Sequence, residues 1–134
     1  MKATVTRESG HRHAVRIRHH ELTLDEPVDV GGTDEAPSPL ELLAASLAGC
    51  VAVTIEMYAA RKGWDLARVE IECDFTPPER GCPTRFELIY RLPDTLTDEQ
   101  VARLTAIASK CPVHRTLEGE VMFDERVERV ALAS

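Results

Sequence analysis

The sequence predicts an α+β fold, organised as one domain over residues 1–134. Three observations lead to this fold class. Several segments alternate apolar and polar residues with a period of two, which is typical of half-buried strands. Two other segments begin with helix-capping motifs and continue with helical spacing of their apolar residues. The elements follow one another as strands, a helix, a hairpin, a helix and a strand, which is the order of an α+β domain and not of a βαβ repeat.

The first third of the chain is predicted to form strands. Residues 4–7 are weakly strand-like, Val15 and Ile17 alternate with arginines, and residues 21–25 alternate in the same way. Residues 26–37 are rich in Gly and Pro, and this composition predicts a loop before the next element.

A long helix is predicted to begin after Ser38 and to end at the capping residue Gly63. Ser38 can cap the helix, Pro39 suits its first position, and Glu41 completes a capping box. The helix is apolar nearly all round over residues 40–53 and rich in small side chains, so we expect it to be buried. A chain of this length has little else to wrap around such a helix. We therefore expect a second subunit to help cover it.

The second half of the chain predicts a hairpin and a second main helix. Residues 69–75 and 86–90 both alternate apolar and polar side chains, and the segment between them is turn-like. Thr97 and Gln100 form a second capping box, and an amphipathic helix follows to about Lys110.

A short helical segment and a strand complete the predicted order. Cys111 and Pro112 begin the helical segment, since Pro suits a first helical position. The chain is then predicted to close with a strand that contains Val121, Phe123 and Val127.

Charge and apolar length exclude several classes of protein. Sixteen basic residues against twenty-three acidic ones give a net charge of −7. Nucleic-acid and anionic-membrane surfaces both need clustered positive charge, so neither partner is expected. The N-terminus has no apolar stretch of signal-peptide length, and residues 40–53 are fewer than the roughly 20 of a membrane span. We expect a cytoplasmic location, no membrane contact and reduced thiols.

The four cysteines are widely spaced and form no Cys-x-x-Cys motif, so no metal site or cofactor is predicted. Cys50, inside the buried helix, is by itself most simply a small core residue. Cys111 is either a thiolate stabilised at a helix N-cap or only the boundary between two helices, and the residues alone leave both readings open. Cys73 is expected in the core by its strand parity, and Cys82, in a turn, at the surface.

Two segments carry a family resemblance. Residues 31–50 read GGTDEAPSPLELLAASLAGC, and residues 111–114 read CPVH. They resemble the two cysteine signatures of the OsmC/Ohr family, the osmotically inducible and organic hydroperoxide resistance proteins. The resemblance implies an intertwined homodimer with the cysteine helices at its centre, packed against antiparallel sheet. It also implies a thiol peroxidase that reduces organic hydroperoxides in oxidative stress defence.

The resemblance gives each of the two cysteines a role. The cysteine that matches Cys50 attacks the peroxide oxygen, and the cysteine that matches Cys111 resolves the sulfenic acid as a disulfide. A dithiol such as a dihydrolipoyl protein then reduces that disulfide. General thiol chemistry agrees, because a thiolate is the nucleophile and a sulfenic acid condenses with a nearby thiol.

Two positions depart from the family pattern. The peroxidases of the family also use an Arg–Glu pair, and Leu40 occupies the position of their Glu. Glu41 is one residue later, which is a rotation of about 100° on a helix. Because Glu41 already completes the capping box, we expect capping before catalysis from it. Arg12 is the first candidate for the arginine, with Arg16 and Arg18 on the same strand face as alternatives.

Two other functions stay open at this point. Leu40 suits a non-catalytic OsmC-fold protein that binds a ligand in an apolar pocket at the dimer interface. Pairing Cys50 or Cys111 with His114 would instead make a Cys–His acyl-transfer enzyme. No third orienting group or oxyanion loop is evident for that enzyme, so it ranks last.

Overall fold

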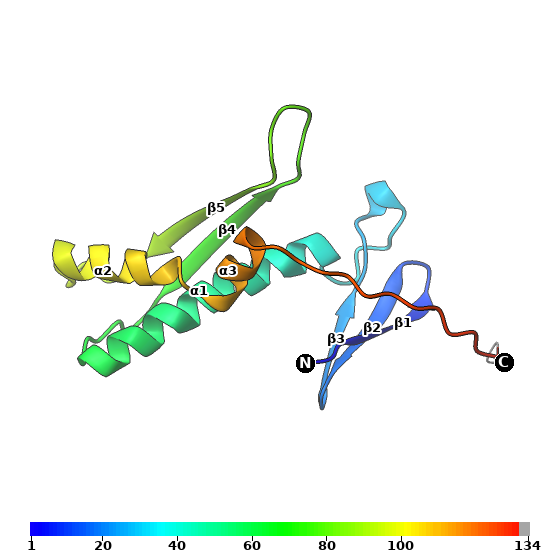
Figure 1. Cartoon of the computed structure of the whole chain (residues 1–134), viewed down its shortest axis with the longest axis horizontal. Helices are drawn as coiled ribbons and strands as arrows, with labels where there is room; N and C mark the ends of the chain where they lie inside the picture. The colour runs from blue at the N-terminus through cyan, green and yellow to red at the C-terminus, as the bar shows by residue number, and fades with distance from the viewer. Residues whose placement is uncertain (132–134) are drawn as a thin grey trace.

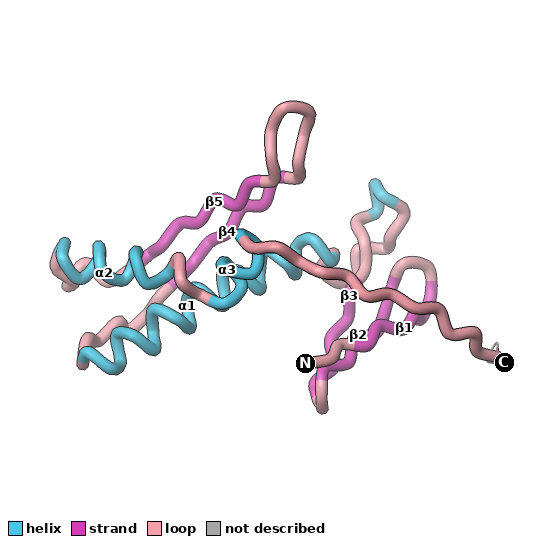
Figure 2. Tube along the Cα trace, in the orientation of Figure 1, coloured by secondary structure: helices cyan, strands magenta, loops and turns pink. Residues whose placement is uncertain are grey.

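The computed structural model describes residues 1–131 and has the predicted α+β architecture (Figures 1 and 2). In chain order the elements are β1 (Thr4–Ser9), β2 (Arg12–Ile17), β3 (His20–Leu24), the 3-10 turn η1 (Val28–Val30), α1 (Pro39–Lys62), β4 (Glu70–Thr76), β5 (Arg85–Arg91), α2 (Asp98–Ala108) and α3 (Pro112–Glu118). The strands form two antiparallel sheets, one of β1-β2-β3 and one of β4-β5.

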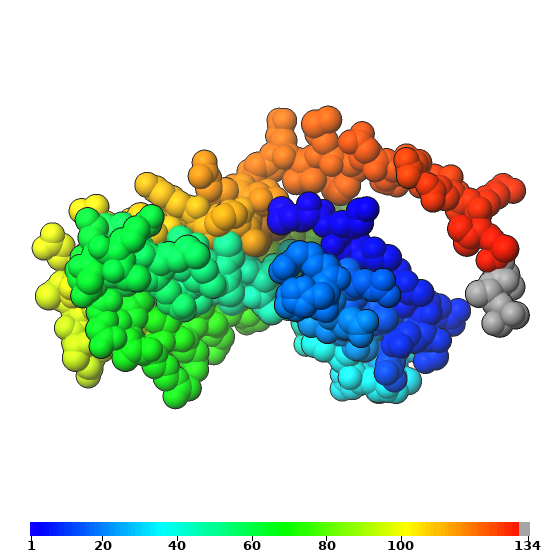
Figure 3. All heavy atoms as spheres, turned by 90° about the horizontal axis from the view of Figure 1, so that it is seen from below, coloured from blue at the N-terminus to red at the C-terminus, as the bar shows by residue number. Residues whose placement is uncertain are grey.

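The β1-β2-β3 sheet lies beyond the N-terminal end of α1, at one side of the remaining elements (Figure 1). Its register places Val15 between Val5 on β1 and Leu22 on β3. Val15 is the only buried side chain among residues 4–24, all of which the structure describes. The space-filling view shows the same sheet, in blue, beside the green and yellow body (Figure 3). This sheet has little core of its own.

The turn between β2 and β3 corrects one expectation. Strand β2 ends at Ile17, and Arg18 has a φ of 56° in the turn. Arg18 therefore does not share a strand face with Arg12 and Arg16, and that prediction is wrong. Arg16 stays within β2, opposite Glu21.

The loop between β3 and α1 is organised around a buried carboxylate. The oxygens of Asp25 accept the N–H groups of Glu26 and Glu35, at 2.7 and 3.1 Å, and the hydroxyl of Thr33 at 2.8 Å. These bonds, the N–H of Glu26 first, lower the pKa of Asp25 from 3.8 to about 2. A Cβ on Gly32 would overlap the Glu26 carbonyl, so the chain crosses itself closely there.

The ends of α1 confirm the predicted caps. The Ser38 hydroxyl accepts the N–H of Glu41 at 3.2 Å, and the Glu41 carboxylate accepts the N–H of Ser38 at 2.9 Å. Pro39 is the first helical residue, and Gly63 ends the helix with a φ of 72°. Local residue chemistry thus decides both limits of the helix.

A smaller part of the α1 surface is buried than its composition predicts. One stripe of the helix is buried in the core, consisting of Leu47, Val51, Ile55 and Ala59. Val53 and Met57 are 48% and 62% exposed. The expectation of a helix buried all round is therefore wrong for a single chain. The helix is long and apolar enough to cross a membrane by composition, a property that the core helices of soluble proteins share.

The core forms where the β4-β5 hairpin, α2 and α3 pack against that stripe of α1 (Figure 2). The predicted hairpin is present, and its register places Cys73 opposite Leu88 and Phe75 opposite Phe86. A capping box on Thr97 begins α2, as predicted, and Cys111 is the N-cap of α3.

The predicted final strand is wrong. Residues 120–131 have no strand or helix, and Val121, Phe123 and Val127 are 56%, 80% and 90% exposed. The segment runs past the N-terminal sheet without joining either sheet (Figure 1). Alternating apolar residues mark a segment that can pair, but a strand needs a neighbour. The described part of this chain supplies none to this segment.

Candidate functional site

The fold brings Cys50 and Cys111 together. Cys50 lies in the middle of α1 and packs against the core, and Cys111 is a fully buried member of that core. The sulfur of Cys111 accepts the backbone N–H of His114 at 3.3 Å, which is the N-cap contact of α3. Both cysteines are free thiols. Two segments about sixty residues apart in sequence thus meet at one thiol pair.

The environment of Cys111 favours its protonated form. Burial is the main factor that raises the pKa of the Cys111 thiol. A side-chain hydrogen bond and charge repulsion from Cys50 raise that pKa as well. The N–H of His114 acts in the opposite direction and is outweighed. The N-cap contact thus lowers the pKa of Cys111, as that reading expects, but burial has the larger effect and favours the other reading, a helix boundary.

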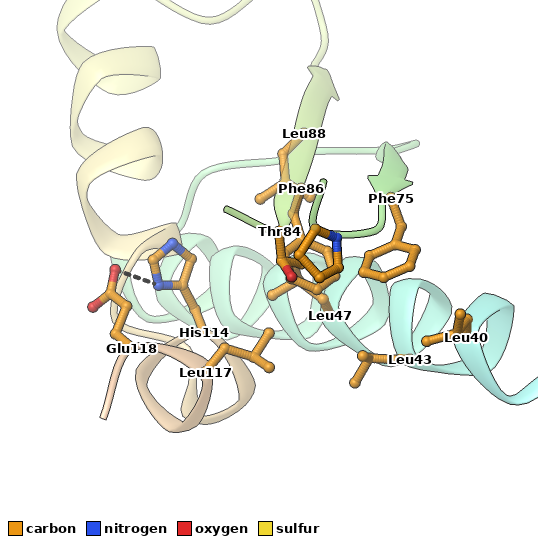
Figure 4. Close-up of a pocket in the computed structure, with 11 residues that line it drawn as sticks. Leu40, Leu43, Leu47, Phe75, Thr84, Phe86, Leu88, His114, Leu117 and Glu118 are labelled. Carbon is orange, nitrogen blue, oxygen red and sulfur yellow. Dashed lines mark ion pairs between the residues drawn. The ribbon is translucent and has the colours of Figure 1, made fainter. Parts of the chain in front are cut away.

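An apolar cavity of about 620 Å³ lies between α1, the hairpin and α3 (Figure 4). Neither cysteine lines it, and its link to Cys111 is His114, whose backbone N–H the Cys111 sulfur accepts. Leu43 and Leu47 line it from α1, and Cys50 follows them on the same helix face, since the spacings are four and three residues. Phe75, Phe86 and Leu88 come from the hairpin, and His114, Leu117 and Glu118 come from α3. Leu40, Pro78 and Thr84 complete the lining. The cavity has room for a small organic molecule next to α3, the helix that Cys111 caps.

His114 and Glu118 form a polar pair at one end of the cavity. Nδ1 of His114 lies 3.0 Å from Oε1 of Glu118, close enough for an ion pair when the ring is protonated. Figure 4 shows this contact, with the second ring nitrogen facing away from Glu118. The sequence reasoning missed Glu118. The available signal was its i, i+4 spacing from His114 on a predicted helix.

Tyr90 is a second residue that the sequence reasoning missed. It lies on β5 opposite Ile71 and packs against the core cluster. Burial raises the pKa of Tyr90, and the charge of Cys111, a member of the core cluster against which Tyr90 packs, raises it further. Its strand parity with Phe86 and Leu88 was the signal that could have found it.

The family profile described as OsmC-like protein matches residues 32–126, which is most of the chain. The chain belongs to the OsmC-like protein family. No curated protein matches this OsmC-like chain by sequence. The resemblance in the two cysteine segments is thereby confirmed at the level of the family.

Solved structures have the same fold as this OsmC-like chain. A candidate osmotic stress induced and detoxification response protein from Psychrobacter arcticus 273-4 is 27% identical, with a TM-score of 0.75 and 87% of each chain covered. An organic hydroperoxide resistance protein OsmC from Legionella pneumophila is 24% identical, with a TM-score of 0.68 and 88% of each chain covered.

A third solved structure contains a bound molecule. It is a candidate organic hydroperoxide resistance protein from Vibrio cholerae O1 biovar eltor, with captopril in one of its active sites. It is 22% identical, with a TM-score of 0.65, and the match covers 89% of this chain and 85% of that chain.

Glu41 of the OsmC-like chain has the structural role that the sequence predicts. Its carboxylate accepts the N–H of Ser38, and this bond lowers the pKa of Glu41, followed in effect by the Ser38 hydroxyl. Leu40, not Glu41, lines the 620 Å³ cavity. Glu41 instead borders a second hollow of about 590 Å³ beside β4, together with Ala44 and Cys73.

Arg12 is held on the N-terminal sheet, away from the thiol pair. Its guanidinium lies 2.7 Å from Glu35 and 3.3 Å from Glu8. The sheet that carries it lies beyond the N-terminal end of α1 (Figure 1). The fold of one chain therefore brings together Cys50 and Cys111 but does not bring Arg12 to them.

The other two cysteines are as expected from the sequence. Cys73 is partly buried on the inner face of β4, and burial raises the pKa of its thiol. Cys82 is exposed near the hairpin tip, where its backbone pairs with Glu79. Both are free, so no bridge joins them.

Proposed function

We propose that this protein is a thiol-dependent peroxidase that reduces organic hydroperoxides, with Cys50 as the attacking thiol and Cys111 as the resolving thiol. The proximity of these two thiols is the observation that carries the proposal, and an apolar cavity lined by His114, whose N–H binds the Cys111 sulfur, supports it. A sulfenic acid on Cys50 would have its resolving partner already in place. The name of the Legionella relative, an organic hydroperoxide resistance protein, agrees with this chemistry.

The proposed reaction has two steps. The thiolate of Cys50 attacks the outer oxygen of the hydroperoxide, the O–O bond breaks, and an alcohol leaves once its oxygen is protonated. The Cys111 thiol then attacks the sulfenic acid, forming a disulfide and releasing water. An external dithiol, such as a lipoyl protein, would return both cysteines to thiols by exchange. The apolar lining of the cavity suits an organic substituent on the peroxide.

We further propose a homodimer, located in the cytoplasm. The exposed stripe of α1 around Val53 and Met57 is apolar, and so are Val121, Phe123 and Val127 near the C-terminus. Apolar surface of this extent is typical of an interface. A second copy would cover α1, and its sheet could supply the neighbour that residues 120–131 lack. The same association would decide whether Arg12 approaches a cysteine of the other subunit.

The test is a single turnover of the reduced protein with cumene hydroperoxide, followed by intact mass and peptide mapping. We expect the wild type to lose two hydrogens and to form a Cys50–Cys111 disulfide. Cys111→Ser should stop at a Cys50 sulfenic acid that dimedone traps, and Cys50→Ser should not consume peroxide. Cys82→Ser is the matched control and should behave as wild type. Absence of the disulfide, with peroxide consumption by Cys50→Ser at the wild-type rate, would refute the proposal.

A ligand-binding protein without catalysis is the second candidate. Leu40 at the cavity supports it, because no carboxylate from that position reaches the cavity. The captopril in the Vibrio relative shows that a protein of this fold takes a small organic molecule in an active site. An organic ligand seen in the native mass spectrum of the purified protein would favour binding, and fast oxidation of Cys50 would exclude it.

A further inference from the structure

The 620 Å³ cavity is apolar except at its α3 end. Of the eleven lining residues, all within the described part of the chain, His114 and Glu118 are the only ones with ionisable side chains. They are also in contact with each other, Nδ1 to Oε1 at 3.0 Å. His114 is about one quarter exposed at its side chain, and Glu118 about two thirds. The imidazole of His114 is therefore the more buried side chain of the pair.

Peroxide cleavage creates a need for a proton inside this cavity. When the thiolate of Cys50 takes the outer oxygen, the rest of the hydroperoxide leaves as an alkoxide. The organic group of that alkoxide lies in the apolar cavity, where an unprotonated oxygen anion is costly because nothing solvates it. A positioned acid removes this cost in the transition state.

The other site residues predicted from the sequence do not offer a proton donor in this cavity. Glu41 holds the N–H of Ser38 and does not line the cavity. Arg12 is paired with Glu8 and Glu35 on the N-terminal sheet. Cys111 is the buried resolving thiol and caps α3 through its sulfur. His114 thus contacts Glu118 on its own helix and Cys111 at the helix start, and Cys50 on α1 and Tyr90 on β5 both interact with that Cys111.

We propose that His114, which lies next to the Glu118 carboxylate, is the general acid that protonates the alkoxide leaving group. This inference rests on the proposed peroxidase function and adds a catalytic residue to it. The step balances: Cys50 thiolate, hydroperoxide and protonated His114 give Cys50 sulfenic acid, alcohol and neutral His114. The imidazole then regains its proton from solvent, which reaches its partly exposed side chain. His114 lines the α3 end of the cavity, and Leu40, which replaces the family's Glu, lines the opposite end (Figure 4).

The experiment compares two oxidants that differ in leaving group. An alkyl hydroperoxide releases an alkoxide, which needs a proton, whereas peracetic acid releases acetate, which does not. Stopped-flow oxidation of reduced His114→Ala should be about 100-fold slower than wild type with cumene hydroperoxide, the lower range for a lost general acid. With peracetic acid the two rates should match. Glu118→Gln should show a smaller loss confined to the hydroperoxide.

The control is Arg115→Ala, which removes an exposed neighbouring side chain on α3 and should leave both rates unchanged. His114→Ala keeps the backbone N–H that caps α3, so its fold is retained and can be checked by circular dichroism. An equal loss with both oxidants would mean a structural role and would overturn the inference, as would no loss with either. A wild type that reacts with neither oxidant would overturn the peroxidase proposal itself.

Discussion

The sulfur of Cys111 accepts the backbone N–H of His114 at 3.3 Å, so one atom is both the cap of α3 and half of the thiol pair. The structural and chemical roles of Cys111 therefore cannot be separated by deleting the side chain. A hydroxyl at this position keeps the cap and removes the redox chemistry, whereas a methyl group removes both.

Substitutions of Cys111 should reveal the cap in stability measurements. We expect Cys111→Ala to be less stable than Cys111→Ser by about 1 kcal/mol, because Ser is a good N-cap residue and Ala is a poor one. Urea unfolding of both variants under reducing conditions measures the difference. Equal stabilities would show that the contact with the His114 N–H contributes nothing to the fold.

Substitutions in the capping box at the start of α1 can distinguish a structural role of Glu41 from a catalytic one. Glu41→Gln should keep the unfolding midpoint and the rate of peroxide consumption, because Gln also closes a capping box. Ser38→Ala should lower stability by about 1 kcal/mol through loss of the N-cap hydroxyl. A large loss of activity in Glu41→Gln, with its stability intact, would assign catalysis to the carboxylate.

Asp25 should make stability depend on pH in the acid range. Its pKa is about 2 in the folded chain, against an ordinary value of 3.8, because N–H and O–H groups bind its ionised form. The stabilisation is complete above pH 3.8 and is lost as the pH falls toward 2. Asp25→Asn should be less stable at neutral pH and lack this acid-range dependence.

Urea midpoints over a pH series measure the effect of Asp25. Asp29→Asn is the matched control, since Asp29 is an exposed carboxylate of the same loop, and it should follow the wild-type curve. If Asp25→Asn showed the same acid loss as wild type, the buried carboxylate could not be its source.

The exposed apolar stripe of α1 should be the site of self-association. Val53→Glu and Met57→Lys place charges at positions that are 48% and 62% exposed in one chain, so the fold of the chain should tolerate them. We expect each to shift the protein from dimer to monomer in sedimentation experiments. Ala106→Glu, on the exposed side of α2, is the control and should leave the dimer intact. Dimers of unchanged mass in both α1 variants would place the interface elsewhere.

Elements governed by local chemistry could be predicted from the sequence. The capping boxes at Ser38 and Thr97, the glycine cap at Gly63 and the alternation in the hairpin all appear in the structure as expected. Each depends on residues within a few positions of one another. The two cysteine segments also gave the correct family, because their residues are specific as well as local.

Properties that depend on distant or absent neighbours could not be predicted in the same way. The alternation around Phe123 shows a capacity to pair, but no local signal supplies the strand beside it. The position of Cys111 at a helix start suggested a lowered thiol pKa, whereas full burial, which only the packed fold reveals, raises it. Glu118 was overlooked because its i, i+4 spacing from His114 is a weak signal on an exposed segment, and only the structure shows the contact between the two side chains.

The small core of the β1-β2-β3 sheet also has a consequence for folding during synthesis. This sheet precedes the helices in the chain, yet Val15 is its only buried side chain, and a small sheet without an apolar layer against it is not stable alone. These strands leave the ribosome before the elements that follow them and are therefore expected to become ordered after those elements. They become stable only when the rest of the chain, or another copy of it, provides a surface for them to pack against. In this protein the order of biosynthesis and the order of folding should run in opposite directions.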